Sequence, residues 1–176
     1  TPTTFTLADN IAQIEGGQHS LLTPSGLSAI NLVNSCFLSH GDEVWVPDNI
    51  YGPNMEHLRN LHQRYGIEVK IYNALEYESF QPTSKAKLLW LEAAGSVSLE
   101  FPDLKRLVRK ARQSGILTAL DNTWGAGLAF NAFDFSDEHL SVGLTVHALT
   151  KYPSGGADIL MGSVVTHDRK LYQQLF

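Results

Sequence analysis

The chain alternates between short apolar runs and longer amphipathic stretches. The short runs have the near-continuous apolar character of buried strands and occupy residues 20–22, 43–46, 67–72, 87–91 and 116–120. The amphipathic stretches have helical spacing and occupy residues 27–37, 55–65 and 103–114. This alternation predicts an α/β fold of three layers, in which a mostly parallel sheet lies between two layers of helices.

Two further helices are predicted near the ends of the chain. Leu7, Ile11 and Ile14 recur at helical spacing, and a pair of glycines follows as a helix C-cap. Residues 169–176 also have a helical pattern, and the chain begins without a methionine. We therefore expect one domain, residues 1–176, that is a piece of a longer polypeptide.

Composition narrows the class of protein. Of the 176 residues, 43% are hydrophobic and 18% are charged, which is enough apolar surface for one buried core. The net charge of -5 argues against nucleic acid or an anionic membrane as a partner. The sequence has no leader pattern and no apolar run that could span a bilayer. Cys36 is the only cysteine and is expected to be a small buried side chain, so we expect a reducing, cytoplasmic location.

Two motifs each place one ionisable residue after an apolar run. Asp121 follows residues 116–120, and Lys151 follows residues 146–150. Taken alone, the aspartate is typical of a helix N-cap and the lysine of a strand end that reaches into solvent. Together they are the pair that pyridoxal phosphate chemistry requires, because a carboxylate keeps the ring nitrogen protonated and an amine forms the Schiff base.

Upstream residues add candidate contacts to a phosphate and to an aromatic ring. Ser25-Gly26-Leu27 begins a predicted helix, where free backbone amides can bind a phosphate, although serine there is also a common N-cap. Tyr51 lies between a strand and a helix, either at the sheet edge where ligands bind or as a half-exposed loop residue. Glu92 ends an apolar strand and is similarly placed, and Glu100 follows a few residues on, although either is also compatible with a simple helix-flanking carboxylate.

Other catalytic motifs are missing from the sequence. It contains neither a P-loop nor a G-x-G-x-x-G fingerprint, and no serine lies in a G-x-S-x-G elbow. The histidines form no H-E-x-x-H or cysteine-histidine cluster, so we expect no catalytic metal. Asp134, Asp137 and Glu138 lack the glycine and spacing of a calcium loop and are expected on a solvated face.

In chain order, the motifs resemble those of the Cys/Met-metabolism family of pyridoxal-phosphate enzymes over nearly the whole chain. They are Thr1-Pro2-Thr3, Ile14-Glu15-Gly16-Gly17, Ser25-Gly26-Leu27, Ile50-Tyr51-Gly52, Asp121-Asn122-Thr123 and Thr150-Lys151-Tyr152. The resemblance implies the cofactor-binding large domain of the type I, aspartate-aminotransferase-like fold. It also implies that an N-terminal arm and a C-terminal substrate domain lie beyond residues 1–176, and that the parent protein is a homodimer or a dimer of dimers.

The resemblance also implies roles for individual residues. Lys151 would be the Schiff-base lysine and Asp121 the partner of the ring nitrogen, while Tyr51 would stack on the ring and assist near the substrate. The remaining cofactor contacts that it implies come from Gly26, Leu27, Thr150 and Ser96.

Residues 91–100 and 121–127 look most similar to the cystathionine beta-lyase branch of the family. This similarity implies a carbon-sulfur lyase that cleaves cystathionine or a cysteine S-conjugate by beta-elimination to a thiol such as homocysteine, pyruvate and ammonia, in transsulfuration and methionine biosynthesis. One alternative is a cystathionine gamma-lyase, gamma-synthase or methionine gamma-lyase on the same scaffold. A second alternative is a truncated, non-catalytic module, and for the isolated 176 residues we expect little or no activity.

The sequence departs from the family pattern at two places. Ala148 stands where many members have a serine that contacts the phosphate, which implies that one phosphate contact is missing. Gly156-Ala157 replaces the usual His-Ser before Asp158.

Overall fold

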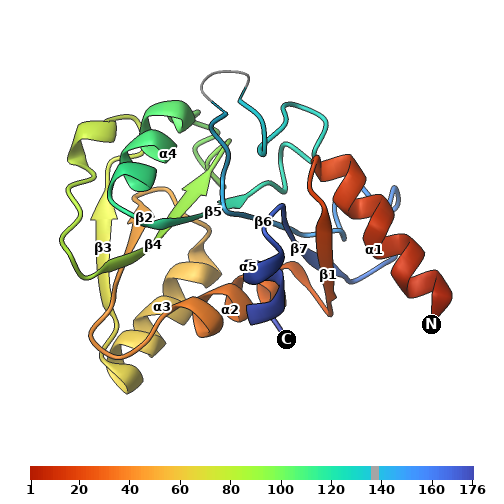
Figure 1. Ribbon diagram of the computed structural model, residues 1–176, viewed down its shortest axis with the longest axis horizontal. Helices are drawn as coiled ribbons and strands as arrows, with labels where there is room; N and C mark the ends of the chain where they lie inside the picture. Colours follow the sequence, from red (N-terminus) through yellow and green to blue (C-terminus); the bar gives the residue numbers. More distant parts are fainter. Residues whose placement is uncertain (136–138) are drawn as a thin grey trace.

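The computed structural model describes residues 1–135 and 139–176, so Asp137 and Glu138 of the acidic stretch lie outside the described residues. Within them, the strands form one sheet in the order β1-β7-β6-β5-β4-β2-β3 (Figure 1). The strands are β1 His19–Thr23, β2 Glu43–Pro47, β3 Glu68–Tyr72, β4 Ala86–Glu92, β5 Leu117–Asp121, β6 Leu144–His147 and β7 Gly162–Thr166. The helices are α1 Pro2–Glu15, α2 Gly26–Phe37, α3 Gly52–Tyr65, α4 Leu104–Gln113 and α5 Arg169–Gln174, with a 3-10 turn at Tyr77–Ser79.

The sheet is mostly parallel, which confirms the fold class predicted from the sequence. Strands β3, β2, β4, β5 and β6 run parallel to one another, whereas β7 and β1 add an antiparallel edge. No helix is described between β6 and β7. A parallel return generally requires a long crossover, usually helical, so β7 comes back antiparallel to β6.

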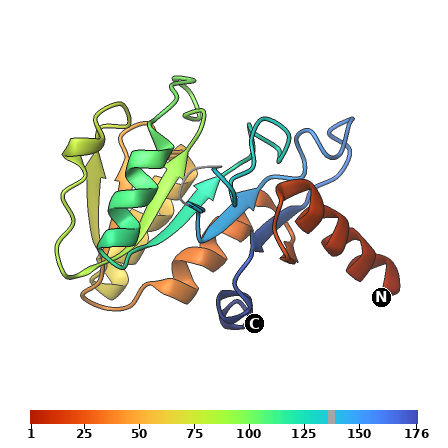
Figure 2. The same cartoon turned by 45° about the horizontal axis from the view of Figure 1, so that its top comes forward.

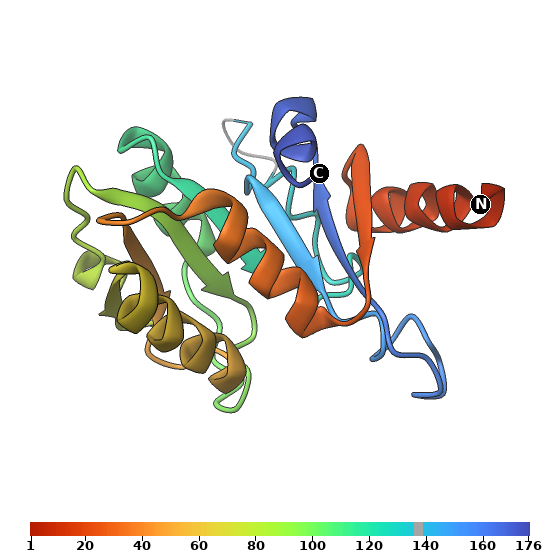
Figure 3. The ribbon, with the colours of Figure 1, turned by 90° about the horizontal axis from the view of Figure 1, so that it is seen from below.

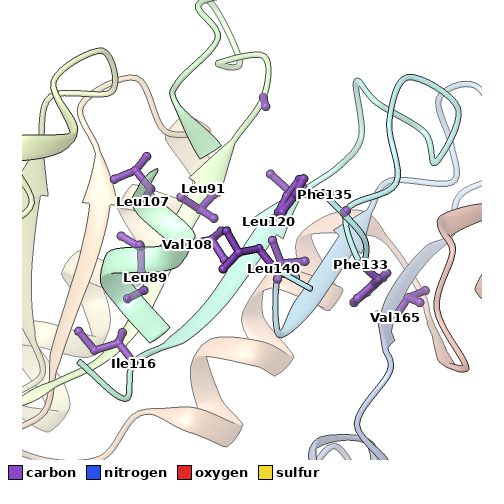
Figure 4. Close-up of a cluster of buried hydrophobic side chains, with 14 of the residues drawn as sticks. Leu89, Leu91, Leu107, Val108, Ile116, Leu120, Phe133, Phe135, Leu140 and Val165 are labelled. Atoms are coloured by element: carbon purple, nitrogen blue, oxygen red, sulfur yellow. The ribbon is translucent and has the colours of Figure 1, made fainter. Parts of the chain in front are cut away.

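Helices cover both faces of the sheet. Helices α1 and α4, together with residues 130–135 and 140–142, pack on one face, and α2, α3 and α5 pack on the other (Figures 2 and 3). Figure 4 shows Leu107 and Val108 of α4 beside Leu89 and Leu91 of β4, in the hydrophobic core on the face that α1 and α4 cover. Because both faces are covered, the central strands are apolar at nearly every position, as the sequence pattern indicates.

One expectation about burial is wrong. Cys36 is exposed because it lies in the last turn of α2, at the margin of the stripe that Ala29, Ile30 and Val33 turn toward the sheet. The apolar stripe of α1 is also only partly covered, since Ile11 is buried but Leu7 and Ile14 are exposed. The N-terminal part of α1 extends beyond the sheet edge in Figure 2, so no strand lies beneath it.

The described helices include none with both the length and the apolar character that a membrane span requires.

Candidate active site

A cavity of about 750 Å³ opens at the carboxyl ends of β4, β5 and β6, beside the first turn of α2. This volume lies within the range of roughly 300–1,000 Å³ that is common for small-molecule sites. Its lining includes every residue for which the sequence predicted a cofactor contact: Gly26, Leu27, Tyr51, Ser96, Asp121, Thr150 and Lys151. The structure therefore gathers residues that are up to 125 positions apart, from Gly26 to Lys151, around one cavity.

The first turn of α2 forms one wall of the cavity. The hydroxyl of Ser25 caps the helix by accepting the N–H of Ser28 over 3.1 Å, so the interpretation as a plain N-cap is correct for this serine. The N–H groups of Gly26 and Leu27 precede it in the first turn, where an α-helix supplies no acceptor of its own. A side chain at Gly26 would place its Cβ 2.6 Å from Cβ of Ala148. Gly26 thus lets the start of α2 pack closely against Ala148, and the free N–H groups of this turn are suited to an anion.

Asp121 ends β5 and faces the same cavity. It lies in register between Glu92 of β4 and Val146 of β6. Burial raises the pKa of the Asp121 carboxyl, and hydrogen bonds from Thr123 act in the opposite direction. One of these bonds is donated by the backbone N–H of Thr123 over 3.1 Å. A cationic group of a ligand placed against Asp121 would favour its ionised form.

Glu92 is a buried member of the cavity wall rather than a helix-flanking carboxylate. Its two carboxyl oxygens accept the backbone N–H groups of Tyr51 over 2.5 Å and Ser96 over 3.0 Å. Burial, followed by the negative charge of Asp121, raises the pKa of Glu92 to about 8. Its position at the end of an apolar strand was the sequence signal for this role, and the structure adds that this strand end lies beside Asp121.

Lys151 enters the cavity from a turn and not directly from a strand. The sequence predicted a strand as far as residue 150, but β6 ends at His147. The hydroxyl of Ser154 donates to the carbonyl of Thr150 over 2.9 Å, and the hydroxyl of Thr150 pairs with the backbone of Met161. Such local bonds between side chain and backbone favour a turn over a continued strand.

Aromatic rings flank the mouth of the cavity. Tyr51, at the N-terminus of α3, has 37% of its surface exposed, and its backbone is held by Glu92. The rings of Trp124 and Tyr152 lie with centroids 6.3 Å apart. A flat ligand that carries an anionic group and a carbonyl could contact an aromatic face, the start of α2 and an amine at the same time.

The two departures from the family pattern also lie at this cavity. Ala148 packs against Gly26, and its N–H donates to the hydroxyl of Thr123 over 3.1 Å. Gly156 and Ala157 line the cavity, and nothing in the structure explains why they replace the usual pair.

Comparison with known proteins places the chain among enzymes. It is 35% identical over 166 residues to a putative cystathionine beta-lyase of Rhizobium johnstonii, covering 93% of this chain and 41% of that protein. It is 35% identical over 164 residues to a cystathionine beta-lyase of Bordetella avium, covering 93% of this chain and 40% of the relative. The chain thus spans less than half the length of these relatives.

A solved structure has the same fold. The cystathionine gamma synthase of Xanthomonas oryzae pv. oryzae, in complex with aminoacrylate and cysteine, matches with a TM-score of 0.88 at 29% identity. The match covers 99% of this chain and 44% of that chain. The family model described as Cys/Met metabolism PLP-dependent enzyme matches residues 1–176. The chain belongs to this family, whose cofactor is pyridoxal phosphate.

Proposed function

We propose that the chain is the cofactor-binding part of a pyridoxal-phosphate-dependent carbon-sulfur lyase, which cleaves cystathionine or a cysteine S-conjugate by beta-elimination in the cytoplasm. The observation that carries this proposal is the cavity that joins Lys151, Asp121, Tyr51 and the first turn of α2. The two relatives at 35% identity, both named as cystathionine beta-lyases, support the substrate class.

The cavity residues fit pyridoxal phosphate group by group. The first turn of α2 at Gly26 and Leu27 suits a phosphate, because its free N–H groups and the helix dipole both favour negative charge. Asp121 suits a protonated ring nitrogen, Tyr51 an aromatic face, and the amine of Lys151 an aldehyde. We propose that these residues hold the cofactor, with Thr150 and Ser96 beside them.

The proposed reaction assigns a task to each of three residues. When bound, pyridoxal phosphate supplies an electron sink for the pair released at the alpha carbon of the substrate. Lys151 anchors the cofactor through its amine and then removes the alpha proton as a general base. Asp121 keeps the proton on the ring nitrogen, and Tyr51 keeps the ring in place. Overall, cystathionine and one water yield homocysteine, pyruvate and ammonia.

The first test is whether pyridoxal phosphate becomes attached to Lys151. We expect the protein mixed with the cofactor to develop a visible absorption band, and borohydride to fix the cofactor covalently on the peptide that contains Lys151. Lys151→Ala should lose both signals, whereas Lys170→Ala, which alters an exposed lysine of α5, should keep them. Labelling of other lysines in place of Lys151 would reject the proposed anchor.

Gamma-elimination or gamma-replacement is the second candidate. It is favoured by the likeness to a cystathionine gamma synthase at 29% identity. The longer protein that contains this chain, supplied with cystathionine, should release pyruvate under the first proposal and 2-oxobutyrate if it is a gamma-lyase. If it binds the cofactor but forms neither product, both lyase assignments fail, and a gamma-replacement enzyme or a non-catalytic binding module remains.

A further inference from the structure

The buried carboxylate of Glu15 contacts the strand ends that line the cavity. Glu15, the last residue of α1, is 1% exposed, yet both of its carboxylate oxygens are engaged. Nδ1 of His147 donates to Oε1 over 2.6 Å, and Nδ2 of Asn122 donates to Oε2 over 2.7 Å. We name these three residues the Glu15 network.

The Glu15 network joins the two strand ends that carry the proposed chemistry. Asn122 directly follows Asp121 at the end of β5, and His147 ends β6 just before the turn that contains Lys151. One side chain of α1 therefore bridges the backbone segments that deliver the carboxylate and the amine to the cavity.

The same strand ends are joined independently of Glu15. The backbone N–H of Asn122 donates to the carbonyl of Val146 over 2.9 Å, and the N–H of Ala148 donates to the hydroxyl of Thr123. The loop after Asp121 also rests against the end of α1, because a Cβ on Gly127 would lie 2.9 Å from Cα of Glu15. Each strand end is thus held both within the sheet and by the last turn of α1.

Stability alone gives little reason to bury such a network. Removing a carboxylate and an imidazole from water is costly, and apolar side chains of similar size often serve a core equally well. In the part of the chain that the structure describes, Nε2 of His147 is buried without a hydrogen-bond partner, which adds to that cost. The groups that face Asp121 are Glu92 from β4, His147 from β6 and Glu15 from α1. Within the Glu15 network, His147 lowers the pKa of Asp121 and Glu15 raises it.

We propose that Glu15 is a positioning residue, which acts through Asn122 and His147 to keep Asp121 aligned with the ring nitrogen of the cofactor. The proposal rests on the proposed function. It predicts that the loss of Glu15 affects the ring nitrogen through Asp121, in addition to any effect on folding.

The test follows the proton on the ring nitrogen. The protein is loaded with ¹⁵N-labelled pyridoxal phosphate, and the nitrogen resonance is recorded against pH for the parent and for Glu15→Gln. We expect Glu15→Gln to bind the cofactor about tenfold more weakly, because one charged hydrogen-bonding group is lost. We also expect its ring nitrogen to lose the proton about one pH unit earlier as the pH rises.

A double-mutant comparison separates positioning from general destabilisation. In an Asp121→Asn background the ring nitrogen no longer faces a carboxylate, so adding Glu15→Gln should leave its titration unchanged. Asp9→Asn removes one acidic charge from the exposed side of the same helix and should behave like the parent. Melting curves of the cofactor-free variants report any effect on folding separately.

Each outcome decides the proposal. A ring nitrogen that titrates identically in Glu15→Gln and the parent overturns it, as does an equal shift in the Asp121→Asn background. If Glu15→Gln does not fold, Asn122→Ala, which leaves Glu15 and His147 intact, must show a smaller shift in the same direction. If the parent itself holds no cofactor, the proposed function fails and this inference fails with it.

Discussion

Glu92 and Asp121 lie opposite each other on neighbouring strands, and each has a raised pKa because it is buried. Two adjacent carboxyl groups in a poorly solvated cavity are unfavourable when both are ionised. At neutral pH, Glu92 with a pKa of about 8 is mostly protonated, so it adds little negative charge beside Asp121. One carboxyl group thus remains for a cationic ring, while the other fastens the loops at Tyr51 and Ser96.

The raised pKa of Glu92 predicts how stability depends on pH. Since the folded state binds the proton more tightly than the unfolded state, stability should fall as pH rises from the ordinary range of a glutamate toward about 8. Glu92→Gln should weaken this dependence in melting temperatures measured from pH 5 to about pH 9. Glu100→Gln is the control, because the hydrogen bond with Ser98 lowers the pKa of Glu100 and keeps it ionised throughout. An unchanged pH profile in Glu92→Gln would contradict the assignment.

Gly26 offers a second test at the residue scale. Alanine there would bring Cβ within 2.6 Å of Ala148 and force the start of α2 outward, so we expect a stability loss of about 1–3 kcal/mol. The affinity for pyridoxal phosphate should also fall. The matched control is Gly52→Ala, which changes the first residue of α3 where a Cβ meets nothing within 4 Å. Equal cofactor affinity in both variants would exclude Gly26 from the phosphate site.

At the scale of elements, buried polar side chains tie the helices to the sheet. Oδ1 of Asn34 in α2 accepts the indole N–H of Trp90 in β4 over 2.8 Å, and its Nδ2 donates to Asn54 of α3 over 3.0 Å. The bond between Asn34 and Trp90 fixes the position of α2 along the sheet. The N-terminus of α2 therefore meets the carboxyl ends of the strands at the cavity.

Trp90→Phe tests this connection. The variant leaves Oδ1 of Asn34 buried without its donor, and we expect the free energy of unfolding to fall by about 1–3 kcal/mol. Urea denaturation measures the change, and Trp124→Phe, at a side chain that is 48% exposed, should differ little from the parent. Equal stability of the two variants would show that the bond between β4 and α2 contributes nothing net.

At the scale of the whole molecule, large apolar side chains remain exposed near the cavity. Val97, Leu128 and Leu160 are 90%, 81% and 72% exposed and lie in the loops that follow β4, β5 and β6. Exposed apolar groups of this kind are common where proteins associate. They support the expectation from the family resemblance that the parent protein is a homodimer or a dimer of dimers.

We therefore predict that the loops after β5 and β6 mediate self-association. Replacing Leu128 and Leu160 together by serine should shift the protein toward monomers in light scattering after size-exclusion chromatography. Leu75→Ser, at a leucine that is 59% exposed in the loop after the outermost strand β3, away from β5 and β6 in the sheet order, should leave the mass unchanged. A parent that is monomeric at all concentrations tested would refute the prediction.

The sequence by itself determined the α/β class and most of the strands and helices, because strand periodicity and glycine caps are local signals. Local signals also indicated Gly26, Tyr51, Asp121 and Lys151, and the family resemblance added Thr150 and Ser96. Only the tertiary structure decided which way β7 runs, where β6 ends before Lys151 and that Cys36 is exposed. It alone also brought Glu15 against His147, and Glu92 against the backbone of Tyr51. These contacts join residues 132 and 41 positions apart, so they arise from the packing of whole elements and leave no periodic trace in the chain.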